Sequence, residues 1–215
     1  MDELYTTILE SCNWEEEVFV QGYGLLMGAI MAAKTPLSAS ALQSLHHSSL
    51  TLPVRTILRP LGSLLTGLRD ETETQPIRIL HLSLRDFLTA RAATSPMCAG
   101  FYIAEKHHSE RLALICLTIL KEHVLPNMPG TGYLKSEFEG IPQGDEGHMS
   151  EELWYACRFW IDHVVDVEVP VSGLVDAIHT FLSTKAVLWI ELVASKGQFQ
   201  KLVKVREWLQ VRYRS

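Results

Sequence analysis

The sequence predicts a mainly α-helical protein that contains one small β-hairpin. Over most of its 215 residues, apolar side chains recur at the three- and four-residue spacing of a buried helical face. Near residues 77–82 the period changes to two, which is typical of a strand. Farther along, a cluster of glycine and proline residues at 126–148 indicates a long loop between two helical parts.

The first helices are predicted from apolar spacing and from signals at their ends. A second helix is predicted over residues 15–33, with acidic residues in its first turn, where they suit the helix dipole, and Pro36 beyond its end. Ser38 is predicted to cap a short third helix. A short first helix is indicated by four apolar residues at helical spacing, Leu4, Ile8, Leu9 and Cys12.

The next elements indicate a winged helix. Pro60 is expected to end or kink a helix that carries Val54, Ile57 and Leu61 on one face. Residues 63–69 and 77–82 are predicted to form a hairpin around a polar tip at 70–75. Helices followed by a hairpin in this order are a winged-helix pattern. An S-x-x-D capping box then predicts a helix over residues 84–92 that is capped by Ser83.

The second half predicts helices that stack as a bundle or a short superhelix. Ser109 and Ser150 are expected to begin two helices, and Gly197 is expected to end another. Three helices are predicted over residues 174–182, 185–196 and 199–212. The domain organisation predicted in this way is a winged-helix-like subdomain at 1–92, a connecting helix and Gly/Pro-rich loop at 93–148, and a helical subdomain at 149–215.

Composition excludes several classes of protein. Hydrophobic residues make up 47% and charged residues 20%, which is a globular composition. The net charge of −6 argues against nucleic acid and anionic membrane as partners. The longest apolar run, at 22–33, is shorter than the roughly 20 residues that span a bilayer. Four cysteines without a C-x-x-C pair favour a reducing, cytoplasmic compartment, and Cys116 and Cys157 are predicted as core residues.

Motifs for catalysis and metal binding are missing from the sequence. It contains no G-x-x-x-x-G-K-[ST] phosphate loop, G-x-S-x-G elbow, H-E-x-x-H motif or EF-hand loop, so we predict no enzyme activity and no catalytic residues. Two histidine pairs, 46–47 and 107–108, are adjacent on helices and point about 100° apart, so we expect no metal site. Arg55 and Arg59 lie among apolar residues, which makes a winged-helix DNA binder a weaker alternative.

One residue remains as a candidate site. His81 lies at the end of the alternating stretch, just before a predicted helix start. A histidine in this place either satisfies a local structural hydrogen bond or contacts a ligand, and the residue pattern leaves both interpretations open.

The stretch around His81 resembles a known family. Residues 78–88 (RILHLSLRDFL) are similar to the winged-helix signature of fungal NACHT proteins, whose usual form is close to LHLSFRDFL. These are STAND NTPases that include vegetative-incompatibility proteins. Further similar stretches, spread over nearly the whole chain, are residues 4–11, 101–103, 153–163 and 181–192.

The resemblance implies a function and a role for His81. In that family these segments follow the P-loop NTPase core and lead to repeat domains. The resemblance therefore implies that this chain is a non-catalytic regulatory and scaffolding segment, which packs on an NTPase core and couples that core to sensor repeats. His81 matches the histidine of the related M-H-D motif, which contacts the ADP β-phosphate, although Leu82 stands where that motif has its acidic residue. ADP or ATP is thus expected only with a NACHT core, and no cofactor in the isolated chain.

A second interpretation keeps the fold and changes the partner. A truncated gene could leave a stand-alone helical module that binds another protein through the apolar surface where a NACHT core would dock.

Overall fold

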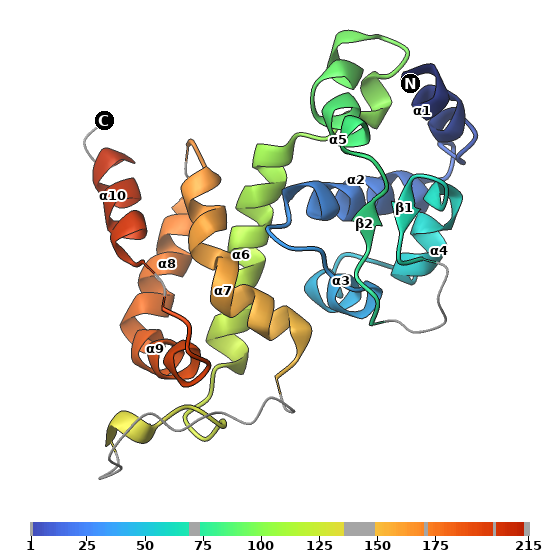
Figure 1. Ribbon diagram of the computed structural model, residues 1–215. Helices are drawn as coiled ribbons and strands as arrows, with labels where there is room; N and C mark the ends of the chain where they lie inside the picture. Colours follow the sequence, from blue (N-terminus) through green and yellow to red (C-terminus); the bar gives the residue numbers. More distant parts are fainter. Residues whose placement is uncertain (1, 69–73, 136–148, 170–171, 200, 213–215) are drawn as a thin grey trace. The chain divides into compact units, whose positions relative to one another are not determined.

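The computed structural model describes residues 2–68, 74–135, 149–169, 172–199 and 201–212 (Figure 1). These residues are mostly helical and include one two-stranded antiparallel sheet, which confirms the predicted mainly α fold class. They divide into two compact units, Met1–His108 and Ser109–Ser215.

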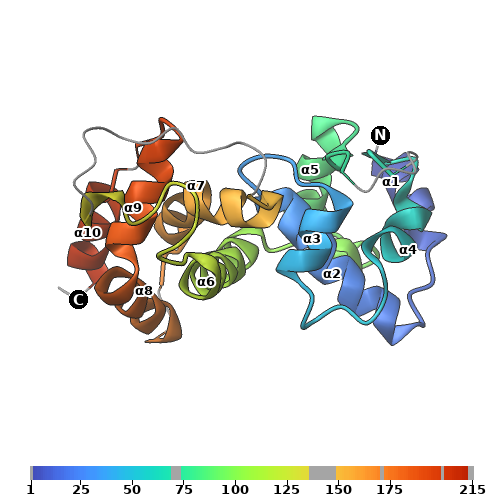
Figure 2. The same cartoon turned by 90° about the horizontal axis from the view of Figure 1, so that it is seen from below.

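The first unit contains five α-helices and the hairpin among its described residues. Helix α4 packs against α2 and α3 (Figures 1 and 2). Three short 3-10 turns, Arg59–Leu61, Arg91–Thr94 and Ala99–Phe101, connect the elements. The elements are α1 (Asp2–Glu10), α2 (Glu17–Ala32), α3 (Ala39–Leu45), α4 (Val54–Leu58), β1 (Leu65–Thr66), β2 (Arg78–Ile79) and α5 (Leu82–Thr89).

Two of the predicted helix ends in this unit are confirmed. The Ser38 side chain accepts a hydrogen bond from the backbone N–H of Ala41 at 3.1 Å, so Ser38 caps α3. Helix α4 ends at Leu58, and the chain tightens into a 3-10 turn that contains Pro60, which lacks the N–H that an α-helix needs.

The predicted hairpin is also confirmed. Leu65 pairs with Ile79 and Thr66 with Arg78. Most of the predicted polar tip lies outside the described residues. Gly67 follows β1 with a φ of +84°, a left-handed conformation that L side chains rarely adopt.

Gly67→Ala is expected to destabilise the first unit by about 1–3 kcal/mol, because of the positive φ and a collision of the new Cβ with the Pro76 carbonyl. Chemical denaturation measures the loss. Gly100→Ala is the matched control, since a Cβ there meets no atom within 4 Å. Equal stability of the two variants would contradict the strain at Gly67.

The first unit extends farther along the chain than the predicted boundary at residue 92. The Tyr23 hydroxyl donates to the Phe101 carbonyl at 2.9 Å, and the Ile103 N–H donates to the Leu88 carbonyl at 2.9 Å. Phe101 also packs on Trp14, with ring centroids 5.0 Å apart. Residues after α5 thus complete the core of this unit, and the division falls inside the next helix.

The second unit consists of helices whose order matches the prediction. They are α6 (Glu105–His123), which begins in the first unit, α7 (Glu151–Asp166), α8 (Ser172–Thr184), α9 (Ala186–Ser195) and α10 (Val203–Arg212). Helix α7 packs against both α9 and α10. Helix α6 begins at Glu105 rather than at the predicted Ser109, whose hydroxyl instead donates to Asp166 at 3.0 Å.

Two further predicted helix ends lie where expected, but only one of them makes the expected hydrogen bonds. Ser150 is the N-cap residue of α7, as expected, but its side chain makes no capping hydrogen bond. Gly197 ends α9 with a φ of +66°, and the N–H groups of Gly197 and Gln198 return to the carbonyls of Ala194 and Val193 at 2.9 Å. This is the Schellman arrangement, which requires a left-handed residue at the position of Gly197.

The core of the second unit centres on three aromatic rings. Trp160, Phe181 and Trp189 are each almost fully buried. Their ring centroids lie 5.2–6.0 Å apart, and all three pairs meet edge to face. The Trp189 indole N–H donates to the Cys157 carbonyl at 3.0 Å. The predicted core position of Trp160 is confirmed.

The first part of the predicted Gly/Pro-rich loop is bound to α9. The Glu191 carboxylate is 1% exposed and accepts the backbone N–H groups of Gly132 and Leu134, both at 2.7 Å. Before this, the Lys185 ammonium donates to the Val124 carbonyl at 2.8 Å. Residues 124–134, which we name the strap, are therefore held to α9 and to Lys185, its N-cap residue. Residues 136–148 lie outside the described part of the chain.

Within the described ranges, no single helix is both long and apolar enough to cross a membrane. The pair Gly173–Thr184 and Ala186–Ser195 passes that test only when taken together, and it is bent by 74°.

Candidate functional site

His81 joins the hairpin to the helix that follows it. It comes two residues after β2 and is the N-cap residue of α5. Its backbone is extended, with φ −142° and ψ 134°, and its Nδ1 atom accepts the backbone N–H of Ser83 at 3.2 Å. The ring itself does what a serine or aspartate side chain usually does at this position.

This geometry corrects the predicted start of α5. The helix spans Leu82–Thr89 rather than 84–92, and Ser83 lies inside it instead of capping it. Because Ser83 is the second residue of the helix, its own backbone N–H is the one that is capped, and its hydroxyl contacts His81 and Tyr5 instead. Asp86 is therefore not part of a capping box.

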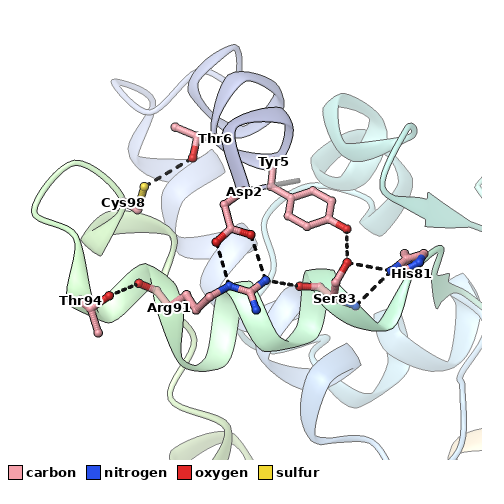
Figure 3. A network of polar contacts seen from close by, with 8 residues as sticks. All are labelled: Asp2, Tyr5, Thr6, His81, Ser83, Arg91, Thr94 and Cys98. Atoms are coloured by element: carbon pink, nitrogen blue, oxygen red, sulfur yellow. Dashed lines mark hydrogen bonds and ion pairs between the residues drawn. The ribbon is translucent and has the colours of Figure 1, made fainter.

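The Ser83 hydroxyl connects His81 to the N-terminal helix. Its Oγ lies 2.7 Å from His81 Nδ1 and 2.6 Å from the hydroxyl of Tyr5 in α1 (Figure 3). Tyr5 is buried and its ring packs on Phe87, with centroids 5.6 Å apart. The short polar chain therefore begins at a fixed tyrosine and ends at an exposed imidazole.

A second link joins the same two helices. Arg91 Nε lies 2.8 Å from Asp2 Oδ2, and its Nη2 donates to Asp2 Oδ1 and to the Ser83 carbonyl, both at 3.0 Å (Figure 3). The planar guanidinium suits this two-point contact with a carboxylate. Because Arg91 holds both α1 and the backbone of Ser83, it fixes α1 beside the first turn of α5.

Apolar side chains flank His81 on the surface. Leu80 is 63% exposed and Leu82 is 74% exposed, and His81 between them is exposed as well. We call these three consecutive residues the His81 tip. The tip thus places one polar ring between two exposed apolar side chains.

The other histidines considered as metal ligands do not converge. In the described part of the chain, no three His, Cys, Asp or Glu side chains are grouped to hold a metal ion. His46 is buried, whereas His47 is exposed, with its Nδ1 3.1 Å from the Ser44 carbonyl. The rings of His107 and His108 meet edge to face, with centroids 5.7 Å apart.

The two arginines considered for DNA contact lie on a short element. Arg55 is on α4, which has five residues, and its Nη1 atom donates to the Leu68 carbonyl at 2.8 Å. Arg59 is exposed in the following 3-10 turn. Both line a surface hollow of about 440 Å³. One N–H group of Arg55 is thus used for a hydrogen bond inside the protein and is not available for a groove of DNA.

Cys116 and Cys157 are core residues, as predicted, and both are fully buried. Burial raises the pKa of the Cys157 thiol to about 12. Burial also raises the pKa of Cys116, and the neighbouring Cys157 raises it further. Both therefore stay protonated near neutral pH, which disfavours a nucleophilic role.

Sequence reasoning found His81 but missed the contacts that join its surroundings to α1. Tyr5 and Ser83 are separated by 78 positions, and Asp2 and Arg91 by 89. No local pattern links positions so far apart. The nearest signal was the apolar spacing of the first helix, which placed a helix there without indicating what its polar edge contacts.

Comparison of the chain with protein-family models, curated proteins and solved structures gave no match.

Proposed function

We propose that this chain is a regulatory and scaffolding segment of a NACHT-type nucleotide-dependent switch, and that it acts by docking on a P-loop NTPase core. It would couple that core to sensor repeats and catalyse nothing itself. The core belongs either to the same polypeptide or to a separate chain.

The observation that carries the proposal is the His81 tip. The residues that resemble the family signature form the end of a hairpin and the start of a helix, and they expose one imidazole between two leucines. The apolar pair would supply docking area, and the imidazole would supply a polar contact with nucleotide held by the core. A contact made only in the docked state shifts the switch by its full free energy.

His81→Ala is expected to speed ADP release from a complex of this chain with a NACHT core by about 10- to 100-fold. A hydrogen bond to a charged phosphate is worth about 1.5–3 kcal/mol, and each 1.4 kcal/mol is about tenfold. Release of a fluorescent ADP analogue measures the effect. His179→Ala, which changes an exposed histidine of α8, is the control.

Thermal melting of the same variants separates the switch from a purely structural role. Removing the α5 cap costs about 1 kcal/mol by itself, so a lowered melting temperature is expected for His81→Ala. If ADP release stays unchanged while the melting temperature falls, His81 is only a helix cap and the proposed switch role is wrong. If no NACHT core binds the chain, the stand-alone interaction module replaces the proposal, with the His81 tip serving another protein.

A further inference from the structure

The hydrogen bonds at Ser83 determine which nitrogen of His81 carries the proton. A backbone N–H only donates, and that of Ser83 points at His81 Nδ1 from 3.2 Å. Nδ1 therefore uses its lone pair and bears no hydrogen. A neutral imidazole with an unprotonated Nδ1 has its hydrogen on Nε2.

The direction of the neighbouring bonds follows from this assignment. Because Nδ1 has no hydrogen to give, the 2.7 Å contact with Ser83 Oγ is a bond in which the hydroxyl donates. A serine hydroxyl has one hydrogen only, so in the 2.6 Å contact with Tyr5 the tyrosine must be the donor. The chain runs in one direction, from Tyr5 to Ser83 to His81.

We infer that Ser83 and Tyr5 are positioning residues, which hold His81 as an Nε2–H donor for an acceptor oxygen of a docked partner. The hydroxyl and the backbone N–H of Ser83 share the one lone pair of Nδ1, and Tyr5 polarises the Ser83 hydroxyl and makes it a better donor. The assignment of the proton rests on the geometry alone. The identity of the acceptor, a phosphoryl oxygen of nucleotide on a NACHT core, rests on the proposed function.

The same tautomer determines which partner groups cannot hydrogen-bond to the His81 tip. With Nδ1 engaged on its own helix, only the Nε2 edge faces a partner, and that edge donates. A partner that presents an N–H group there meets a hydrogen rather than a lone pair, so its polar group would be left unpaired. Helix α1 thus contributes to the docking site through Tyr5, which lies outside residues 78–88.

Long-range proton–nitrogen NMR correlation of the histidine rings in the full chain tests the assignment, at about pH 8, above the ordinary histidine range. The His81 signals are identified by their loss in His81→Ala. In the unchanged chain we expect a single tautomer, with Nδ1 unprotonated. Ser83→Ala keeps the backbone N–H and removes only the hydroxyl donor, so we expect it to move His81 part of the way toward the tautomer mixture of a free imidazole. We expect Ser83→Thr to keep the single tautomer and Tyr5→Phe to lie between the unchanged chain and Ser83→Ala. His179 serves as the internal reference.

An Nδ1–H tautomer in the unchanged chain would overturn the inference, as would a His81 tautomer unaffected by Ser83→Ala in a folded variant. In the complex with a NACHT core, Ser83→Ala should speed ADP release in the same direction as His81→Ala but by a smaller factor. The NMR measurement needs no partner and tests the tautomer alone. The ADP release measurement tests the proposed function, so the two can fail independently.

Discussion

Trp160→Ala is expected to lower the free energy of unfolding of the second unit by about 3–5 kcal/mol. The side chain is 0% exposed, and it meets Phe181 and Trp189 edge to face. Alanine would remove these contacts and leave a cavity that two large rings cannot collapse to fill. A loss of this size is a large part of the stability of an ordinary domain.

Urea unfolding followed by circular dichroism measures this loss. Trp154→Ala is a matched control on the same helix, because Trp154 is half-buried and its ring lies 5.9 Å from the Arg158 guanidinium. It should cost clearly less than Trp160→Ala. Trp160→Phe should also cost less, since it keeps a ring and removes an indole N–H that is buried without a hydrogen-bond partner. Equal losses for Trp154→Ala and Trp160→Ala would show that the aromatic cluster is not the centre of the core.

Glu191→Ala is expected to cost about 2–6 kcal/mol and to detach the strap from α9. The carboxylate is the acceptor for two backbone amides, and each amide left without a partner costs about 1–3 kcal/mol. Glu191→Gln keeps the shape but places an NH₂ group against one of two N–H donors, so it should give roughly half of the effect.

Amide hydrogen exchange at Gly132 and Leu134 is the direct measurement for this prediction. Exchange of both amides should become much faster in Glu191→Ala, and the melting temperature should fall. Glu122→Ala, on the exposed surface of α6, controls for the loss of a negative charge. Protection of the two amides in Glu191→Ala would mean that other contacts hold the strap.

Local signals were sufficient for most of the helices. The helical spacing of apolar residues, the stop at Pro60 and the left-handed end at Gly197 each act within a few residues, so a single sequence contains the whole cause. The predicted start of α6 was wrong because it depends on a contact outside the local sequence. Ser109 is a good capping residue, but burial against α7, which the local sequence does not encode, uses its hydroxyl for Asp166.

The candidate site was predictable only in part. A histidine before a helix start can be seen in the sequence, but a serine two residues later is the commoner cap, so the sequence favoured Ser83 over His81 as the cap. Glu191 left a signal as an acidic residue within an apolar helix. Its partners lie 59 and 57 positions earlier, where no periodicity indicates them.

The bonds between α1 and α5 also set an order of assembly during synthesis. Helix α1 has nine residues, fewer than the roughly 12–15 that make an isolated helix even marginal in water. Its partners Ser83 and Arg91 leave the ribosome 78 and 89 residues after the Tyr5 and Asp2 that they bind. Helix α1 must therefore stay unstructured until α5 has followed it. Ribosome-bound chains that end before residue 83 should show α1 open to protease.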